Sequence, residues 1–90
     1  MKMIDYKQGP TLVQKQLKHA LKITLTLTTY KRDRRLIIKK TEEDYFIKEE
    51  GYYHQTFTFD NEKEMIKQLK KQMKIEFPRS HKLYMDIKEE

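Results

Sequence analysis

The chain has 90 residues, of which 38% are charged and 37% hydrophobic, and its formal net charge at pH 7 is +6. A chain of this length buries only a lean core, and the absence of cysteine excludes disulfides, thiolate metal sites and thiol catalysis. No stretch approaches the ~18 apolar residues of a membrane span. We therefore expect one small cytoplasmic domain over residues 1–90, with 1–10 as a loosely ordered N-terminal segment.

The charge is unevenly distributed along the sequence. Residues 1–40 hold eight Lys and three Arg against two Asp, a net charge of +9, whereas residues 41–60 have a net charge of −5. A basic segment attracts polyanions through electrostatic steering and counterion release. The alternative is that basic and acidic strands lie side by side in a sheet and neutralise each other.

The first regular element that we expect is a short helix over residues 11–22, with Thr11 as a candidate N-cap. Its apolar face is indicated by four residues at helical spacing, Val13, Leu17, Ala20 and Leu21.

Residues 23–60 predict four antiparallel strands in a meander. From Ile23 to Thr28 apolar residues alternate with threonines, which is typical of a half-buried strand. Residues 35–40, 45–48 and 52–60 supply the other strands, and we expect 49–51 to be a turn in which Gly51 adopts a positive φ. One face of this sheet is apolar and the other is rich in Thr and Tyr.

A second helix is predicted between Asn61 and Phe77. Asn61 and Glu64 have the spacing of a capping box, and Pro78 ends the helical pattern. The apolar stripe of this helix consists of Ile66, Leu69, Met73 and Phe77. A second stripe consists of Lys63, Lys67, Lys70 and Lys74. Its plain explanation is the solvent side of the helix, and the alternative is a contact with phosphate.

The last predicted element lies near the C-terminus, where Leu83, Met85 and Ile87 alternate with other residues. This alternation indicates either a fifth strand at a sheet edge or a partner-binding tail. The predicted order is α-β-β-β-β-α-β. This order indicates an α+β domain, an antiparallel four- to five-stranded β-meander with one or two helices packed on one face.

Side chains typical of catalysis or metal binding are sparse. Ser80 is the only serine and is adjacent to His81, and a nucleophile and its base are rarely neighbours in sequence. The three histidines share no metal-ligand spacing. The acidic pairs at 42–43, 49–50 and 89–90 are expected in solvated turns or at the terminus. We therefore expect no enzyme, no metal site and no cofactor.

A basic tip between the first two predicted strands is the main functional signal. Four of its five residues, 31–35, are cationic, and arginine both contacts phosphate and stacks on bases. Aromatic residues on the Thr-rich sheet face can stack unpaired bases. We therefore expect a nucleic-acid-binding protein that uses this tip and the adjoining sheet face, with the contacts Tyr30, Lys31, Arg32, Arg34, Arg35, Lys39, Tyr52 and His54.

The alternative hypothesis is a protein–protein interaction module, such as a small regulator or inhibitor, with no nucleic-acid binding. Such a protein would use residues 83–87 as an added strand, or a helix face as a dimer surface. A homodimer is compatible with either hypothesis, and neither requires a membrane.

Overall fold

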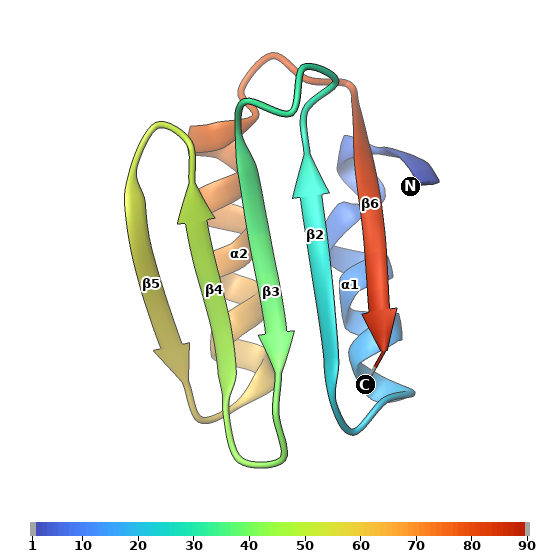
Figure 1. The fold of residues 1–90 in the computed structure, drawn as a ribbon, viewed down its shortest axis with the longest axis vertical. Coiled ribbons are helices and arrows are strands. Elements are labelled where there is room, and N and C mark those ends of the chain that lie inside the picture. Colours follow the sequence, from blue (N-terminus) through green and yellow to red (C-terminus); the bar gives the residue numbers. More distant parts are fainter. Residues whose placement is uncertain (1, 90) are drawn as a thin grey trace.

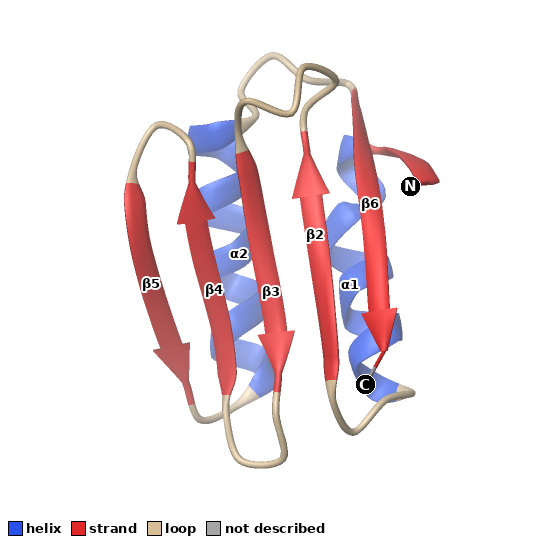
Figure 2. Ribbon diagram, viewed as in Figure 1, coloured by secondary structure: helices blue, strands red, loops and turns tan. Residues whose placement is uncertain are grey.

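The computed structural model describes residues 2–89. They form a six-stranded antiparallel sheet with two helices on one face (Figures 1 and 2). The chain runs in the order β1 (Lys2–Asp5), the 3₁₀ turn η1 (Tyr6–Gln8), α1 (Gly9–Lys18), β2 (Ile23–Thr28), β3 (Arg35–Lys40), β4 (Tyr45–Glu50), β5 (His54–Phe59), α2 (Glu62–Glu76) and β6 (Lys82–Glu89). This confirms the predicted α+β class, with one strand more than the four to five expected.

The N-terminal segment is part of the fold instead of the loosely ordered segment expected over 1–10; Met1 lies outside the described residues. Strand β1 pairs with β6 from Lys2↔Met85 to Asp5↔Lys82. Helix α1 then begins at Gly9, before the predicted cap at Thr11, with Pro10 in its first turn, a position that proline tolerates.

Helix α1 is shorter than the sequence pattern predicts. It ends at Lys18, and Leu21, which we expected on its apolar face, is 79% exposed in the loop before β2. Val13 and Leu17 are buried as predicted. A helix that ends at residue 18 cannot keep the helical spacing as far as residue 21, which explains the difference.

Strands β2 to β5 form the predicted meander, and their alternation buries one face. The register places Leu25 opposite Ile38, and Ile38 opposite Ile47, so these three side chains lie in one row beneath the helices. All three are fully buried, and each such side chain stabilises the fold by about 1.5–3 kcal/mol. In Figure 1, α1 lies behind β2 and β6, and α2 lies behind β3 and β4.

Helix α2 follows the sequence prediction closely. The Asn61 side chain accepts a hydrogen bond from the backbone N–H of Glu64 at 2.8 Å, which confirms the N-cap. Ile66, Leu69, Met73 and Phe77 are buried, and the helix ends at Glu76, before Pro78. Here the local signals and the tertiary packing agree.

Strand β6 lies between β1 and β2, not at an edge. It pairs with β2 over residues 84–89 and with β1 over residues 82–85. Leu83 and Met85 are therefore core residues, and a partner strand cannot add beside them. The prediction of an edge strand or partner-binding tail at residues 83–87 is wrong for this part of β6.

The turn between β4 and β5 also differs from the prediction. Within the described chain no glycine has a positive φ, and the only residue that does is Arg32, at 59°. Gly51 is needed for space: a Cβ atom there would lie 2.3 Å from Oε1 of Glu76 and 3.1 Å from the Arg34 side chain. The prediction of a positive φ is wrong because the constraint comes from α2, not from the turn itself.

Candidate nucleic-acid interface

The loop between β2 and β3 contains most of the predicted interface. Its backbone is closed by hydrogen bonds from Thr29 N to Arg34 O at 3.2 Å and from Arg32 N to Thr29 O at 3.0 Å. The Thr29 hydroxyl donates to Asp33 Oδ1 at 2.8 Å, and this bond lowers the pKa of Asp33, with smaller help from the adjacent cations. The loop presents Tyr30, Lys31 and Arg32 to solvent.

Two of the predicted cations have partners inside the protein. Arg34 donates from Nη1 to the backbone carbonyl of Glu76 at 3.3 Å, and its guanidinium lies 5.6 Å from the ring centroid of Tyr52. Arg35 forms an ion pair with Glu50 at 3.3 Å, and Lys48 pairs with the same carboxylate at 3.3 Å. These contacts leave Lys31 and Arg32 as the freer cations of the loop.

The predicted residues are divided between two sides of the sheet. Arg35, Glu50 and His54 form one row on the face that no helix covers, because β3 pairs Arg35↔Glu50 and β4 pairs Glu50↔His54. Lys39 is on the same face, roughly 13 Å farther along β3, where it lies opposite Phe46. Arg34, by contrast, reaches the end of α2 on the helix side.

An exposed aromatic pair lies beside the loop. The rings of Tyr30 and Tyr84 are 6.2 Å apart between centroids, and Tyr30 is 80% exposed. Tyr84 stands next to Thr28, whose register neighbour on the other side is Arg35. Tyr30 therefore sits where a base stacked on its ring would have cations within reach.

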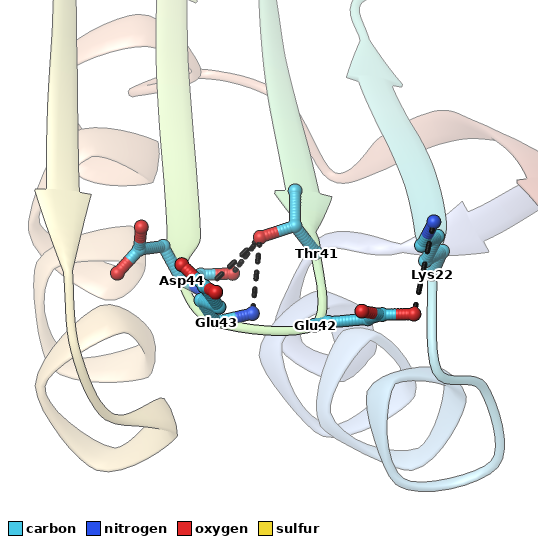
Figure 3. Close-up of polar contacts among 5 residues, drawn as sticks. All are labelled: Lys22, Thr41, Glu42, Glu43 and Asp44. Carbon is cyan, nitrogen blue, oxygen red and sulfur yellow. Dashed lines mark hydrogen bonds and ion pairs between the residues drawn. The ribbon is translucent and has the colours of Figure 1, made fainter.

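The acidic segment 41–60 masks this loop only in part. Glu42, Glu43 and Asp44 lie in the turn between β3 and β4, at the opposite end of the sheet from the loop (Figures 1 and 3). In that turn Glu42 pairs with Lys22 at 3.8 Å. Of the acids in this segment, Glu50 is the one that neutralises a predicted contact.

The helical layer forms a second cationic surface, which we call the helix surface. Its exposed lysines are Lys7, Lys15, Lys18, Lys63, Lys67, Lys70, Lys71 and Lys74, accompanied by Glu62 and Glu64. Within residues 2–89, none of these lysines forms an ion pair; all four ion pairs join residues of strands and loops, namely Lys22–Glu42, Arg35–Glu50, Lys48–Glu50 and Lys82–Asp5. The sequence predicted the lysine stripe of α2. It did not show that so few carboxylates lie near these lysines in the folded protein.

Two adjoining hollows run along the groove between α1 and α2. One, of about 390 Å³, is lined by Gln14, Glu62, Lys63, Ile66, Lys67 and Lys70. The other, of about 170 Å³, is lined by Tyr6, Lys7, Pro10, Lys70, Met73 and Lys74. Lys70 borders both hollows, so the lysine stripe of α2 runs past the two of them. Gly9 lies beside this groove, where a Cβ atom would be 2.7 Å from the methyl group at the flexible end of Met73.

A buried carboxyl pair, which was not predicted from the sequence, joins the sheet to α2. Glu49, expected in a solvated turn, is fully buried on β4, and so is Glu76 on α2. Glu76 accepts backbone N–H bonds from Tyr52 at 2.8 Å and Tyr53 at 3.3 Å, whereas Glu49 Oε1 accepts from the amides of Gln55 and Gln72. The signal was present in the alternation of β4, which puts Glu49 on the same face as Ile47.

The two carboxyl groups have opposite pKa shifts. Burial raises the pKa of Glu49, and its hydrogen bond with Glu76 raises it further. Burial alone would also raise the pKa of Glu76, but the hydrogen bond from Glu49 and those from the Tyr52 and Tyr53 N–H groups outweigh it, so the pKa is lowered. No donor in the described chain reaches Glu49 Oε2, and a proton on this oxygen, shared with Glu76, would satisfy it.

The comparisons with known proteins add no functional assignment: no protein-family model, curated protein or solved structure gives a significant match. Among the described helices, none is long and apolar enough to cross a membrane. Residues 2–89 also contain no group of three or more His, Asp or Glu side chains placed to hold a metal ion.

Proposed function

We propose that this protein binds nucleic acid without sequence specificity, and that the helix surface is its main contact with the phosphate backbone. The observation that carries this proposal is the groove between α1 and α2, which is lined by lysines that have no carboxylate partner in the described chain. Unpaired cations release the counterions of a polyanion on binding, whereas cations already paired contribute less.

The spacing of the lysines suits a backbone contact. Lys63, Lys67, Lys70 and Lys74 follow one side of α2 over roughly 16 Å at 1.5 Å per residue. Lysine is a compact point charge on a flexible stem, so it contacts phosphates without demanding one base sequence. This supports binding governed by salt concentration more than by sequence.

The loop and sheet face predicted from the sequence remain a second candidate surface of the same protein. Tyr30, Lys31, Arg32 and Lys39 are exposed there, and the Tyr30 ring, 80% exposed, supplies a stacking platform. Single strands would favour this surface, because stacking needs unpaired bases.

Two variants with identical net charge distinguish the two surfaces. The first is Lys67→Gln/Lys70→Gln/Lys74→Gln on the helix surface, and the second is Lys31→Gln/Arg32→Gln/Lys39→Gln on the sheet side. Each removes three positive charges. Affinity for a labelled DNA duplex and a single strand of the same length is measured by fluorescence anisotropy across a range of salt concentrations.

We expect the helix variant to bind the duplex more weakly and to reduce the log–log salt slope by about 2.7, which is 0.9 for each lost phosphate contact. We expect the sheet-side variant to change duplex binding little and single-strand binding more. Equal losses in both variants would show a response to net charge alone and would overturn the assignment of a surface. No binding by the parent protein at low salt would overturn the function itself.

A further inference from the structure

The two edges of the sheet differ in length and charge. Strand β1 at one edge has four residues, including Lys2 and Asp5. Strand β5 at the other edge has six residues, and none of them is Asp, Glu, Lys or Arg. It lies within Gly51–Phe59, the longest stretch of the sequence that lacks these four residue types. Edge strands are usually protected from pairing by charges, by proline or by short length, and β5 has none of these devices.

The outer side of β5 is open to pairing. Its inner side pairs with β4 from Tyr45↔Phe59 to Glu50↔His54, and no described strand pairs with its outer side. In Figure 1, β5 projects beyond α2, which lies behind β4. Phe57 and Phe59 point to the helix side of the sheet, stack at 6.4 Å and remain only partly buried.

We propose that β5 pairs antiparallel with β5 of a second copy of this chain, which joins the two sheets into one. The distribution of charge favours this strand as the contact between two copies. A chain with a net charge of +6 repels its own copies over most of its surface, and an uncharged strand is where this repulsion is smallest.

The strand is also compatible with itself across a two-fold axis. An antiparallel pair centred on Thr56 puts this threonine opposite its counterpart and His54 opposite Thr58 of the other copy. A pair centred on Phe57 puts the two phenylalanines opposite each other, and aromatic cross-strand pairs are favourable. Neither register brings like charges together within the strand.

Such pairing has a consequence for the proposed function, although the dimer does not depend on it. A two-fold axis perpendicular to the sheet keeps the helices of both copies on the same side. The two lysine grooves would then face one polyanion together, which raises the effective concentration of the second contact.

The test measures mass by sedimentation equilibrium over protein concentrations from low to high micromolar, without nucleic acid. The edge variant is Thr56→Lys/Thr58→Lys, and the control is Met3→Lys/Ile87→Lys, which adds two charges near the opposite edge. We expect the parent and the control to dimerise with concentration, and the edge variant to stay monomeric with an unchanged circular dichroism spectrum. A monomeric parent, or an edge variant that dimerises as the parent does, would overturn the proposal.

A second measurement covers the case in which the lysine variant does not fold. The chain has no cysteine, so a nitroxide label attached through Thr56→Cys or Met3→Cys reports one position in each copy. Pairing through β5 predicts a short interlabel distance at position 56 and a distance of roughly 50 Å at position 3, from eleven strand spacings. The reverse order of distances would exclude pairing through β5.

Discussion

Two turns flank strand β4, one before it and one after it, and they are stabilised in different ways. The turn at its start is closed by contacts within Thr41–Asp44: the Thr41 hydroxyl accepts from the N–H groups of Asp44 at 3.1 Å and Glu43 at 3.4 Å (Figure 3). The turn at its end is held by Glu76, more than twenty residues away in sequence, through the N–H groups of Tyr52 and Tyr53. The first turn is closed by local contacts, whereas the second has one local hydrogen bond, from Gly51 N to Tyr53 O at 3.1 Å, and also depends on the docking of α2.

The hydrogen bonds of the two turns should contribute differently to the stability of the fold. The first turn is largely solvated, so each of its contacts exchanges a hydrogen bond to water for one within the protein and gains little. The second turn depends on buried groups, for which a lost partner costs more than the contact itself contributes. Mutations at the second turn should therefore affect stability much more than mutations at the first.

The largest effect is expected from Glu76→Ala. This change leaves the N–H groups of Tyr52 and Tyr53 without their acceptor, and it removes the hydrogen-bond partner of the Glu49 carboxyl group. We expect a loss of about 3 kcal/mol in the free energy of unfolding, measured by urea denaturation. Glu76→Gln keeps the shape and one acceptor oxygen, so its loss should be intermediate; equal stability of both variants and the parent would contradict a clamp by Glu76.

A smaller loss is expected from Gly51→Ala. The added methyl group would overlap Glu76 Oε1, which is itself fixed by the hydrogen bonds of the turn. Overpacking of this kind costs about 1–3 kcal/mol. Gly9→Ala is the matched comparison, because its new methyl meets only the flexible end of Met73. Urea midpoints should fall clearly for Gly51→Ala and much less for Gly9→Ala, and the reverse order would refute the close approach of Glu76.

The variant Glu49→Gln tests whether Glu49 and Glu76 make the stability of the fold depend on pH. Because the folded pKa of Glu49 is raised, its contribution to stability is complete below the ordinary value of 4.5 and is lost as pH rises through the folded pKa. The contribution of Glu76 has the opposite sign, since its folded pKa is lowered: it is present above 4.5 and is lost as pH falls through the folded value.

A glutamine at position 49 can donate to Glu76 as the protonated acid does, and it cannot ionise. The variant should therefore lose the decline in stability above pH 4.5 while it keeps the decline on acidification that comes from Glu76. Urea midpoints of parent and variant, measured from pH 2 to pH 8, record both the loss on acidification and the loss at higher pH. Parallel profiles over this range would show that Glu49 does not titrate with folding.

The same contrast explains what the sequence could predict. The cap at Asn61, the stop at Pro78 and the alternation of β2 depend on neighbours in the chain, and the structure confirms them. The alternation of β4 places Glu49 on the buried face, but the partners of Glu49 and the space requirement at Gly51 depend on α2 lying across the end of β4, which no local pattern encodes. The alternation of residues in β6 predicts a strand, but it does not predict that this strand lies between β1 and β2 in the sheet.

The candidate interface follows the same division. The sequence identified the cations of the loop, and Lys31 and Arg32 are exposed there. It could not identify the partners of Arg34 and Arg35, because these are set by the docking of α2 and by the register of β3 with β4. The lysines of α2 were visible as a stripe, but their groove requires α1 beside them.

The smallest effect is expected at the first turn, from Thr41→Val. This change keeps the β-branched shape and removes the hydroxyl that accepts from the N–H groups of Glu43 and Asp44. Because solvent can reach these groups, the loss in the free energy of unfolding should be about 0.5–1 kcal/mol, and the pH dependence of stability should not change.

The variant Glu42→Gln is the control at the same turn. It breaks the exposed pair with Lys22 and should leave the urea midpoint unaltered, since pairs of this kind contribute little. A loss for Thr41→Val as large as that for Glu76→Ala would mean that both turns of β4 depend on tertiary packing, and the contrast between them would fail.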